Sequence, residues 1–272
     1  MTISLTIIFV LAGLAIGSFL NVCIDRLPAR KSLISPPSHC DSCQKTLSAR
    51  DNIPLVSYLW LRGRCRYCGA RIPRRVIIVE GLTGLIFFLA SLRYVLATPP
   101  DYFAFSLTAF WSCIFIVVIF IDLEHKLILN KITYPAAVVA LILLGIDSVF
   151  PGAGILGNLK LVPQPSILSG LIAAAICFVF FFIVFLINPR GLGMGDIKLV
   201  TLIGLATGLP LALVALFIGI IIGGVAAIFL LALRKKGRKD VMPYGVFLGI
   251  GPIVALLWGS YIIDWYRAVF KI

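Results

Sequence analysis

Long apolar segments constrain this chain more than any other feature of its sequence. A helix needs about 20 apolar residues to cross a hydrocarbon core of about 30 Å, and only 13% of this chain is charged, against roughly 25% in a soluble domain. The segments that reach or approach this length are Thr2–Ile24, Val76–Leu96, Phe103–Ile121, Ile132–Val149, Ile167–Ile187, Leu211–Leu233 and Val246–Ile263. The sequence therefore predicts an all-α polytopic membrane protein.

The first apolar segment, Thr2–Ile24, is expected to stay in the membrane. It has neither a basic region before its apolar stretch nor an Ala-x-Ala cleavage site, which a removable signal peptide would carry. We therefore expect a retained first helix over residues 1–24.

One further segment, Ile197–Leu209, is only 13 residues long and precedes Pro210. By length it is a short span, a re-entrant piece or a kinked extension of its neighbour. Charge decides between these, because Lys and Arg collect on the cytoplasmic side of membrane proteins. If the segment is a span and the N-terminus is outside, residues 25–75 and Arg234–Lys239 share the cytoplasmic side. We therefore expect about eight transmembrane helices.

The net charge of +13 follows this topology. Residues 25–75 hold 11 of the 24 basic residues. The basic residues that fall on the outer side are Arg93, Lys160, Arg267 and Lys271. Because the basic residues flank membrane segments, the charge favours contact with the bilayer and does not indicate a nucleic-acid partner.

The polar region 25–75 contains two Cys-x-x-Cys pairs, the pattern of a zinc ribbon. They are Cys40 with Cys43 and, after a spacer, Cys65 with Cys68. Four thiolates suit tetrahedral zinc, and a region too small for a large core benefits from a metal. A disulfide pair is the alternative, which a reducing cytoplasmic compartment disfavours. We expect a small cytoplasmic domain with a structural zinc site.

Two aspartates at predicted cytoplasmic helix ends are the candidate catalytic residues. Asp122 closes the third span and Asp196 opens the sixth. Two carboxylates close together in a partly dry site share a proton, so one can activate a water while the other donates a hydrogen bond to the attacked carbonyl. The glycines Gly193 and Gly195 would leave room for a substrate backbone beside Asp196.

Structural explanations for both aspartates remain open at this point. Asp196 suits a helix N-cap, and Asp122 is spaced to form a surface ion pair with Lys126 one turn later. Glu80, near the inner end of the second helix, is placed to cap that helix or to pair with Arg74 or Arg75. The sequence has no Gly-x-Ser-x-Gly, His-Glu-x-x-His or Gly-Lys-Ser/Thr motif that would offer another chemistry.

Taken in order, several motifs resemble the bacterial type IV prepilin peptidases, also called leader peptidase/N-methyltransferases. They cover nearly the whole chain: GSFLNVCIDRLP at 17–28, the two cysteine pairs, DNIPLVSYLWLRGRCRYC at 51–68, the stretch from Arg75 to Glu80, Asp122, GMGDIKL at 193–199 and PYGVFLGIG at 243–251. Gly-x-Gly-Asp by itself also resembles presenilin-type proteases.

The resemblance implies a multi-pass protease of the bacterial inner membrane. It would remove the basic leader of a type IV prepilin or pseudopilin after a glycine, and methylate the new N-terminus with S-adenosylmethionine. By motif position, Asp122 and Asp196 would be catalytic and the four cysteines would bind zinc. The implied organisation is a first helix (1–24), a four-cysteine metal-binding domain (25–75) and a seven-helix peptidase domain (76–272).

The sequence departs from the family pattern at three places. Ile128-Leu129-Asn130 replaces a frequent Ile-Pro-Asp, which removes a third acidic group. The first cysteine pair lacks a proline after Cys40, and PYGVF stands where Pro-Phe-Gly-Pro-Phe is commoner. No nucleotide-binding glycine motif marks a site for S-adenosylmethionine in residues 25–75.

Two other functions fit parts of this pattern. The Gly-x-Gly-Asp motif allows a presenilin-like protease that cuts within substrate helices, and a pair of membrane carboxylates allows a proton-coupled transporter. The cysteine pairs and the motif order favour the prepilin peptidase.

Overall fold

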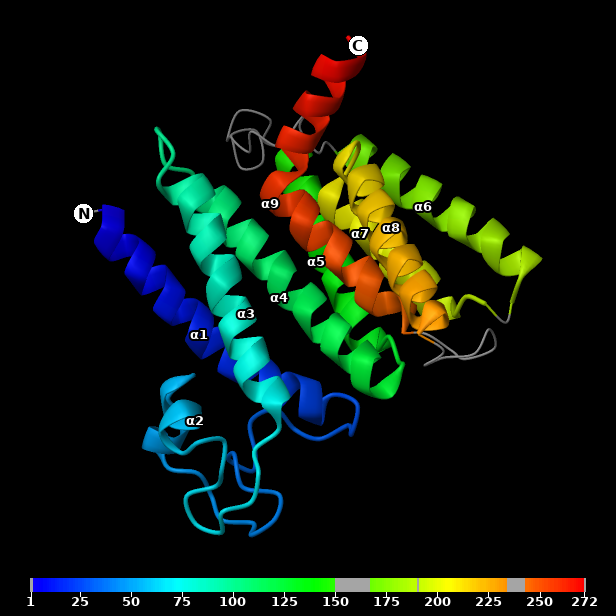
Figure 1. Cartoon of the computed structure of the whole chain (residues 1–272). Helices are drawn as coiled ribbons and strands as arrows, with labels where there is room; N and C mark the ends of the chain where they lie inside the picture. The colour runs from blue at the N-terminus through cyan, green and yellow to red at the C-terminus, as the bar shows by residue number, and fades with distance from the viewer. Residues whose placement is uncertain (1, 150–166, 190, 234–242, 272) are drawn as a thin grey trace. The chain divides into compact units, whose positions relative to one another are not determined.

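A computed structural model describes residues 2–149, 167–189, 191–233 and 243–271, apart from the side chains of residues 2, 3 and 147–149. Within these ranges every regular element is a helix (Figure 1). In chain order they are α1 Thr2–Arg26, η1 Ala49–Asn52, α2 Val56–Trp60, α3 Arg74–Ala90, the π-helical η2 Ser91–Val95, α4 Tyr102–His125, α5 Asn130–Val149, α6 Ile167–Ile187, α7 Met194–Thr207, α8 Leu211–Ala232 and α9 Tyr244–Phe270.

Six helices in the described residues are long and apolar enough to cross a membrane, which confirms the all-helical, multi-pass prediction. They are α1, α3 with η2, α4, α6, α8 and α9. Two predicted spans are not among them: α7 has 14 residues, and the described part of α5, Asn130–Ile146, is also short. The basic cluster Arg234–Lys239, on which the topology depends, lies outside the described residues, as do Arg190 and Lys160.

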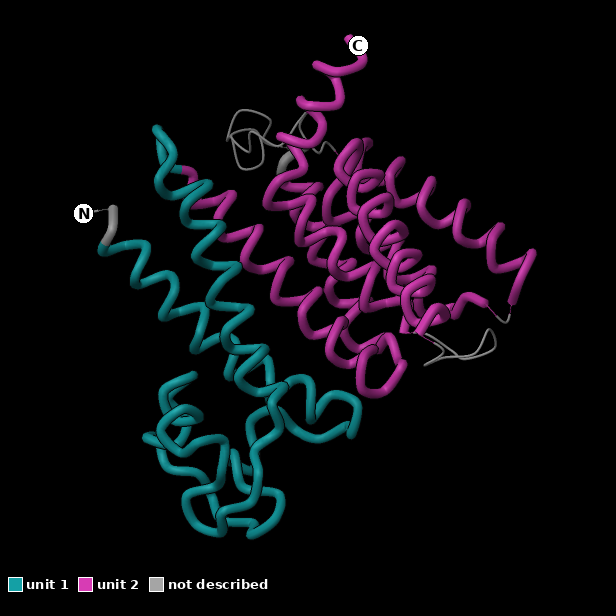
Figure 2. Tube along the Cα trace, viewed as in Figure 1, with its two compact units in different colours: residues 1–100 teal, residues 101–272 magenta. Residues whose placement is uncertain are grey.

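The chain divides into two compact units, residues 1–100 and 101–272 (Figure 2). In the first, α1 and α3 lie side by side (Figure 1) because glycines remove the side chains between them. A Cβ on Gly17 would lie 2.8 Å from Glu80 Cα, and one on Gly13 would lie 2.7 Å from the Phe87 ring. Small residues four apart are a common device for close helix packing in membranes.

A polar cluster joins α1 to the first turns of α3. Asn21 donates to the carbonyl of Val76 at 3.1 Å, and Arg75 pairs with Asp25 at 2.7 Å. Glu80, which is only 4% exposed, accepts a hydrogen bond from the backbone N–H of Leu55 at 2.9 Å. Glu80 thereby ties the polar region 25–75 to α3.

In the second unit, α7 is a short central helix that packs against α5, α6, α8 and α9. Most of its apolar side chains are buried, including Leu199 and Val200 at 0% exposure, and Met194 at its start is half exposed. Gly204 lets α6 approach closely, since a Cβ there would lie 2.6 Å from the backbone nitrogen of Ala174. The helix that carries Asp196 is therefore held on several sides.

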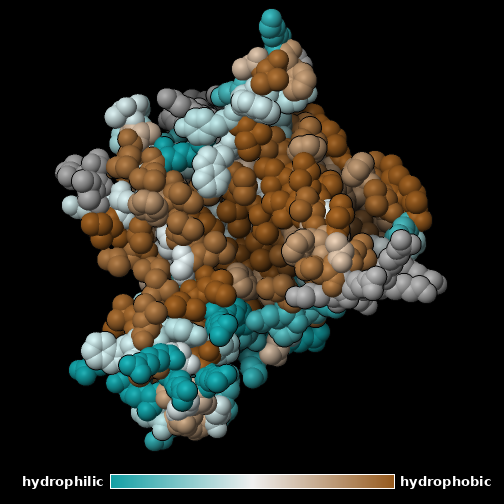
Figure 3. Space-filling model, viewed as in Figure 1, coloured by the Kyte–Doolittle hydropathy of each residue, from teal (hydrophilic) through white to brown (hydrophobic). Residues whose placement is uncertain are grey.

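Exposed apolar side chains are abundant on α6 and α8, as expected of lipid-facing helices. Examples are Phe180 and Ile187 on α6 and Phe217 and Ile228 on α8, each more than half exposed. In the space-filling view, hydrophobic side chains cover the helices of the second unit. Hydrophilic side chains gather over the part of the first unit that contains α2 (Figure 3).

Candidate active site and metal centre

The two cysteine pairs form two knuckles with the same backbone pattern. In the first, Cys40 N–H donates to Lys45 O at 3.0 Å and Gln44 N–H donates to Cys40 O at 2.8 Å. In the second, Cys65 N–H donates to Ala70 O at 2.7 Å and Gly69 N–H to Cys65 O at 3.0 Å.

The fourth residue after the first cysteine of each knuckle has a positive φ. It is 57° at Gln44 and 73° at Gly69. The left-handed residue closes each turn, so that both cysteines of a knuckle project their thiols to the same side.

The knuckles bring all four sulfur atoms together. The Sγ atoms of Cys40, Cys43, Cys65 and Cys68 lie within 4.8 Å of one another, and those of Cys40 and Cys68 are 3.8 Å apart. Sulfurs at about 2.3 Å from one tetrahedral zinc would be about 3.8 Å apart, whereas a disulfide requires about 2.05 Å. All four thiols are free, so the geometry fits a metal and not the disulfide alternative.

The thiols influence one another's ionisation. Backbone N–H groups of Cys43 and Ser42 lower the pKa of Cys40 to about 6. The Ala70 N–H favours the thiolate of Cys68, but desolvation and the three neighbouring cysteines together raise its pKa to about 11. The thiolate of Cys40 therefore forms readily, whereas that of Cys68 needs a cation to neutralise it, as expected of a metal site.

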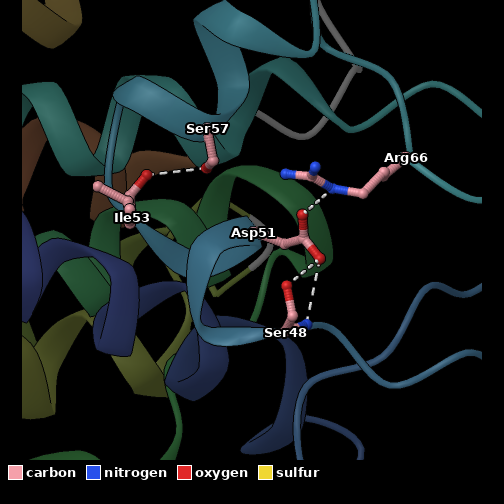
Figure 4. A network of polar contacts seen from close by, with 5 residues as sticks. All are labelled: Ser48, Asp51, Ile53, Ser57 and Arg66. Atoms are coloured by element: carbon pink, nitrogen blue, oxygen red, sulfur yellow. Dashed lines mark hydrogen bonds and ion pairs between the residues drawn. The ribbon is translucent and has the colours of Figure 1, made fainter.

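A polar network supports the second knuckle (Figure 4). Asp51 accepts hydrogen bonds from the hydroxyl and the N–H of Ser48 at 2.7 and 3.1 Å, and Arg66 Nε donates to it at 2.7 Å. Arg66 lies between Cys65 and Cys68, so the network ties the knuckle to η1. The Ser48 hydroxyl and, after some opposing desolvation, Arg66 lower the pKa of Asp51.

Asp122 lies in the last turn of α4 and is 5% exposed. Its Oδ2 accepts a hydrogen bond from the N–H of Val246, at the beginning of α9, at 3.1 Å. A Cβ on Gly245 would lie 2.9 Å from the same oxygen, so α9 can approach this closely only through a glycine. The surface ion pair with Lys126 is wrong: no ion pair joins these two residues in the part of the chain described, because Asp122 is buried against α9.

Asp196 lies in the first turn of α7. One interpretation of the sequence made it the N-cap of this helix, and that interpretation is wrong. The helix begins at Met194, Gly193 is the N-cap, and Oδ2 of Asp196 accepts the Gly193 N–H at 3.0 Å. The glycine is extended (φ −84°, ψ 149°) and has no side chain that could cap the helix, so the carboxylate of Asp196 satisfies one of the free N–H groups.

The structure brings the two aspartates into one neighbourhood. Asp122 and Asp196 are close enough to interact electrostatically. Tyr244, at the start of α9, is close enough to Asp196 to interact with it in the same way. Ile128 packs between the start of α7 and the start of α9. A Cβ added to Gly195 would lie 3.0 Å from the Cβ of Ile128, and one added to Gly245 would lie 3.1 Å from its Cδ1. The space expected beside Gly195 is therefore filled by Ile128 in this structure.

Three residues near the aspartates had no role in the sequence interpretation. Gly245 and Tyr244 lie in PYGVF, a stretch that served there only to compare the chain with the family pattern. Ile128 was noted only because the acidic group two residues later is missing. A pattern of consecutive residues gives no sign that α9 returns to the end of α4.

Together these features define a class: a multi-pass membrane protein with a four-cysteine cluster and a pair of aspartates at helix ends. The comparisons with known proteins agree with it. Residues 11–94 match the family described as Bacterial Peptidase A24 N-terminal domain, and residues 109–228 match the Type IV leader peptidase family. No solved structure matches the chain.

Relatives match the chain over nearly its whole length. A prepilin leader peptidase/N-methyltransferase of Aeromonas salmonicida (strain A449) is 32% identical, with 94% of this chain and 91% of the relative covered. Those of Aeromonas hydrophila and Bacillus subtilis (strain 168) are 31% and 29% identical, covering 96% of this chain and 93% and 97% of the relatives. The chain belongs to the type IV leader peptidase family, which confirms the resemblance seen in its motifs.

Proposed function

We propose that this protein is a prepilin leader peptidase/N-methyltransferase. It removes the basic leader of a type IV prepilin or pseudopilin after a glycine and then methylates the new N-terminal amine. The observation that carries the peptidase proposal is that Ile128 contacts Gly195, next to Asp196, and also Gly245, which lies against Asp122, so both aspartates lie at helix ends around one side chain in a chain of this family.

The proposed hydrolysis needs only these two carboxylates and a water. One aspartate is ionised and takes a proton from the water, while the other is protonated and donates to the scissile carbonyl. Each has one oxygen held by a backbone N–H, that of Val246 for Asp122 and that of Gly193 for Asp196. These bonds fix how the carboxylates are oriented before substrate arrives, which is the positioning that such catalysis requires.

The proposed topology has eight spans, with α7 as a short one and the N-terminus outside. It places the end of α4 and the start of α7 at the cytoplasmic face of the bacterial inner membrane, where a prepilin leader would lie. Residues 25–75 then form a cytoplasmic domain, and residues 76–272 carry the peptidase helices. A short span at α7 is tolerated because other helices surround it.

For the four-cysteine cluster we propose structural zinc. Cys40, Cys43, Cys65 and Cys68 would hold it, and its contribution would be to stabilise a domain with few buried apolar side chains. S-adenosylmethionine is the proposed methyl donor, and we assign no residue to it.

The decisive experiment compares prepilin cleavage by the purified full-length protein and its variants Asp122→Asn and Asp196→Asn. Each substitution keeps the shape of the side chain but removes the carboxylate, so we expect the cleavage rate to fall about 10²–10⁴-fold. Mass spectrometry of the products should place the cut after a glycine at the leader junction.

The matched control is Asp101→Asn at the other end of α4. Asp101 caps that helix by accepting the Ala104 N–H at 2.8 Å, and asparagine caps helices equally well. This variant should cleave at the wild-type rate. Normal cleavage by either Asp122→Asn or Asp196→Asn would contradict the proposal, and a cut within an apolar span would point to presenilin-like proteolysis.

A further inference from the structure

The short helix α2 in the first unit has an apolar face that the described chain leaves open. Val56, Leu59 and Trp60 are 56%, 66% and 81% exposed. Residues at i, i+3 and i+4 lie on one side of a helix, so these three side chains form a single face. An exposed tryptophan beside an exposed leucine is costly in water and indicates a binding surface.

Local contacts hold α2 at both of its ends. The N–H of Gly63 donates to Tyr58 O at 2.8 Å, and a Cβ on Gly63 would lie 2.9 Å from the Tyr58 hydroxyl. Ser57 donates its hydroxyl to Ile53 O at 2.8 Å (Figure 4). These contacts fix the turn before α2 and the turn after it, and the helix between them keeps its three apolar residues on one face.

The hydrogen bond from Leu55 to Glu80 sets the depth of α2 along the membrane helix α3. Leu55 directly precedes α2, and its side chain lies against Gly81, 3.9 Å from where a Cβ would be. Glu80 comes six residues after Arg74, which is about 9 Å along the helix at 1.5 Å per residue. The span Arg74–Val95 has 22 residues, enough for the whole hydrocarbon core. The helix α2 therefore begins beside the first two turns of α3, close to the end at which this membrane span starts.

The charges around α2 complement an anionic lipid surface. Arg50 precedes the helix, Arg62 and Arg64 follow it, and all three are exposed. The nearby acid Asp51 is already engaged by Arg66. The cytoplasmic leaflet is negatively charged, and tryptophan is enriched at the boundary between headgroups and acyl chains.

We propose that the face formed by Val56, Leu59 and Trp60 inserts into the headgroup region of the cytoplasmic leaflet, with Arg62 and Arg64 on lipid phosphates. The contact holds the four-cysteine domain against the membrane. It rests on α1 and α3 crossing the bilayer and does not depend on the peptidase chemistry.

The test uses the full-length protein in bilayers of phosphatidylcholine and phosphatidylglycerol, with part of the phosphatidylcholine brominated. The difference between the emission of wild type and of Trp60→Phe isolates Trp60 from the other tryptophans. We expect Trp60 emission to be blue-shifted and largely lost when the bromines lie near the top of the acyl chains, and less affected when they lie near the chain ends. Leu59→Gln should shift the emission to the red and weaken the quenching.

The matched control is Tyr67→Trp in the Trp60→Phe background, because Tyr67 is exposed on the second knuckle. Its emission should be that of a water-exposed indole and should stay unquenched. Trp60 emission that is insensitive to brominated lipid would overturn the proposal. If Trp60 emission changed on adding a prepilin but not with brominated lipid, the face would bind substrate and not lipid. If Trp60 emission responded to neither brominated lipid nor prepilin, the face would have no lipid contact.

Discussion

Asn130 stands where the type IV prepilin peptidases that this chain resembles often have an aspartate, and its neighbours show what the amide does. Its Oδ1 accepts a hydrogen bond from Lys198 Nζ at 3.0 Å, and the same ammonium lies 5.4 Å from the centre of the Tyr134 ring. Lys198 comes two residues after Asp196, so these contacts tie the start of α7 to α5. Asn130 is thus explained as an anchor between α5 and α7.

Gly245 is the residue whose substitution best tests the geometry around Asp122. In Gly245→Ala the new Cβ would lie 2.9 Å from Oδ2 of Asp122 and 3.1 Å from Ile128, so α9 or the carboxylate must move. We expect kcat for prepilin cleavage to fall at least tenfold, which corresponds to about 1.4 kcal/mol of transition-state stabilisation, while KM changes little. Steady-state kinetics on a prepilin measures both.

The control is Gly224→Ala on α8, where an added Cβ meets nothing within 4 Å. It should leave kcat unchanged and slightly stabilise the helix. Equal effects of the two substitutions would mean that Gly245 matters for helix stability only.

At the scale of elements, the cysteine knuckles and η1 form a small domain whose stability depends on few interactions. Its residues bury little apolar surface, and the Asp51 network joins the second knuckle to the preceding turn. Such a domain should release its metal by local opening, and any contact that resists opening should slow this release.

Replacing Asp51 by asparagine should therefore speed the release of zinc to a chelator. Protein prepared without chelator should hold about one zinc per chain, and at pH 7 the variant should lose it several times faster. Because the folded pKa of Asp51 is lowered, its stabilisation is complete above the unfolded value of about 3.9 and is lost only as the pH falls through the lowered pKa. The effect should thus be constant between pH 6 and 8, as a colorimetric zinc assay can measure.

The control for this measurement is Asp41→Asn in the first knuckle. Asp41 is exposed and accepts a hydrogen bond through its backbone carbonyl, from Gln44 at 2.8 Å, which the substitution keeps. A variant at Asp51 that released zinc no faster than the Asp41 variant would rule out a supporting role for the network.

At the scale of the whole molecule, the topology depends on whether α7 crosses the membrane. With α7 as a span, its C-terminal end at Gly208 lies outside and the Arg234–Lys239 cluster lies inside. Alkaline phosphatase folds only outside the cytoplasm, so fusions at residue 208 should be active and fusions at residue 236 inactive. Activity of fusions in cells, normalised to their amount, makes this comparison.

A fusion in residues 25–75 provides the internal reference, because it should be inactive in the same assay. An inactive fusion at residue 208 would mean that α7 re-enters the membrane without crossing it, and the side assigned to α8 and α9 would have to be reversed.

The sequence by itself determined the helical, multi-pass class, the family and the four metal-ligand candidates. Apolar length and Cys-x-x-Cys spacing are local properties, so they can be read along the chain. Helix ends were less certain: α7 begins at Met194, three residues before the predicted segment, because Gly193 and not Asp196 is its N-cap.

Only the tertiary structure decided what surrounds each candidate. It buries Asp122 against the start of α9, across 124 residues of sequence, and it places Ile128 between Gly195 and Gly245. It also joins the residue before α2 to α3 through Glu80. These contacts depend on how helices distant in sequence pack, and packing reflects the shapes of both surfaces, which no single stretch of residues contains.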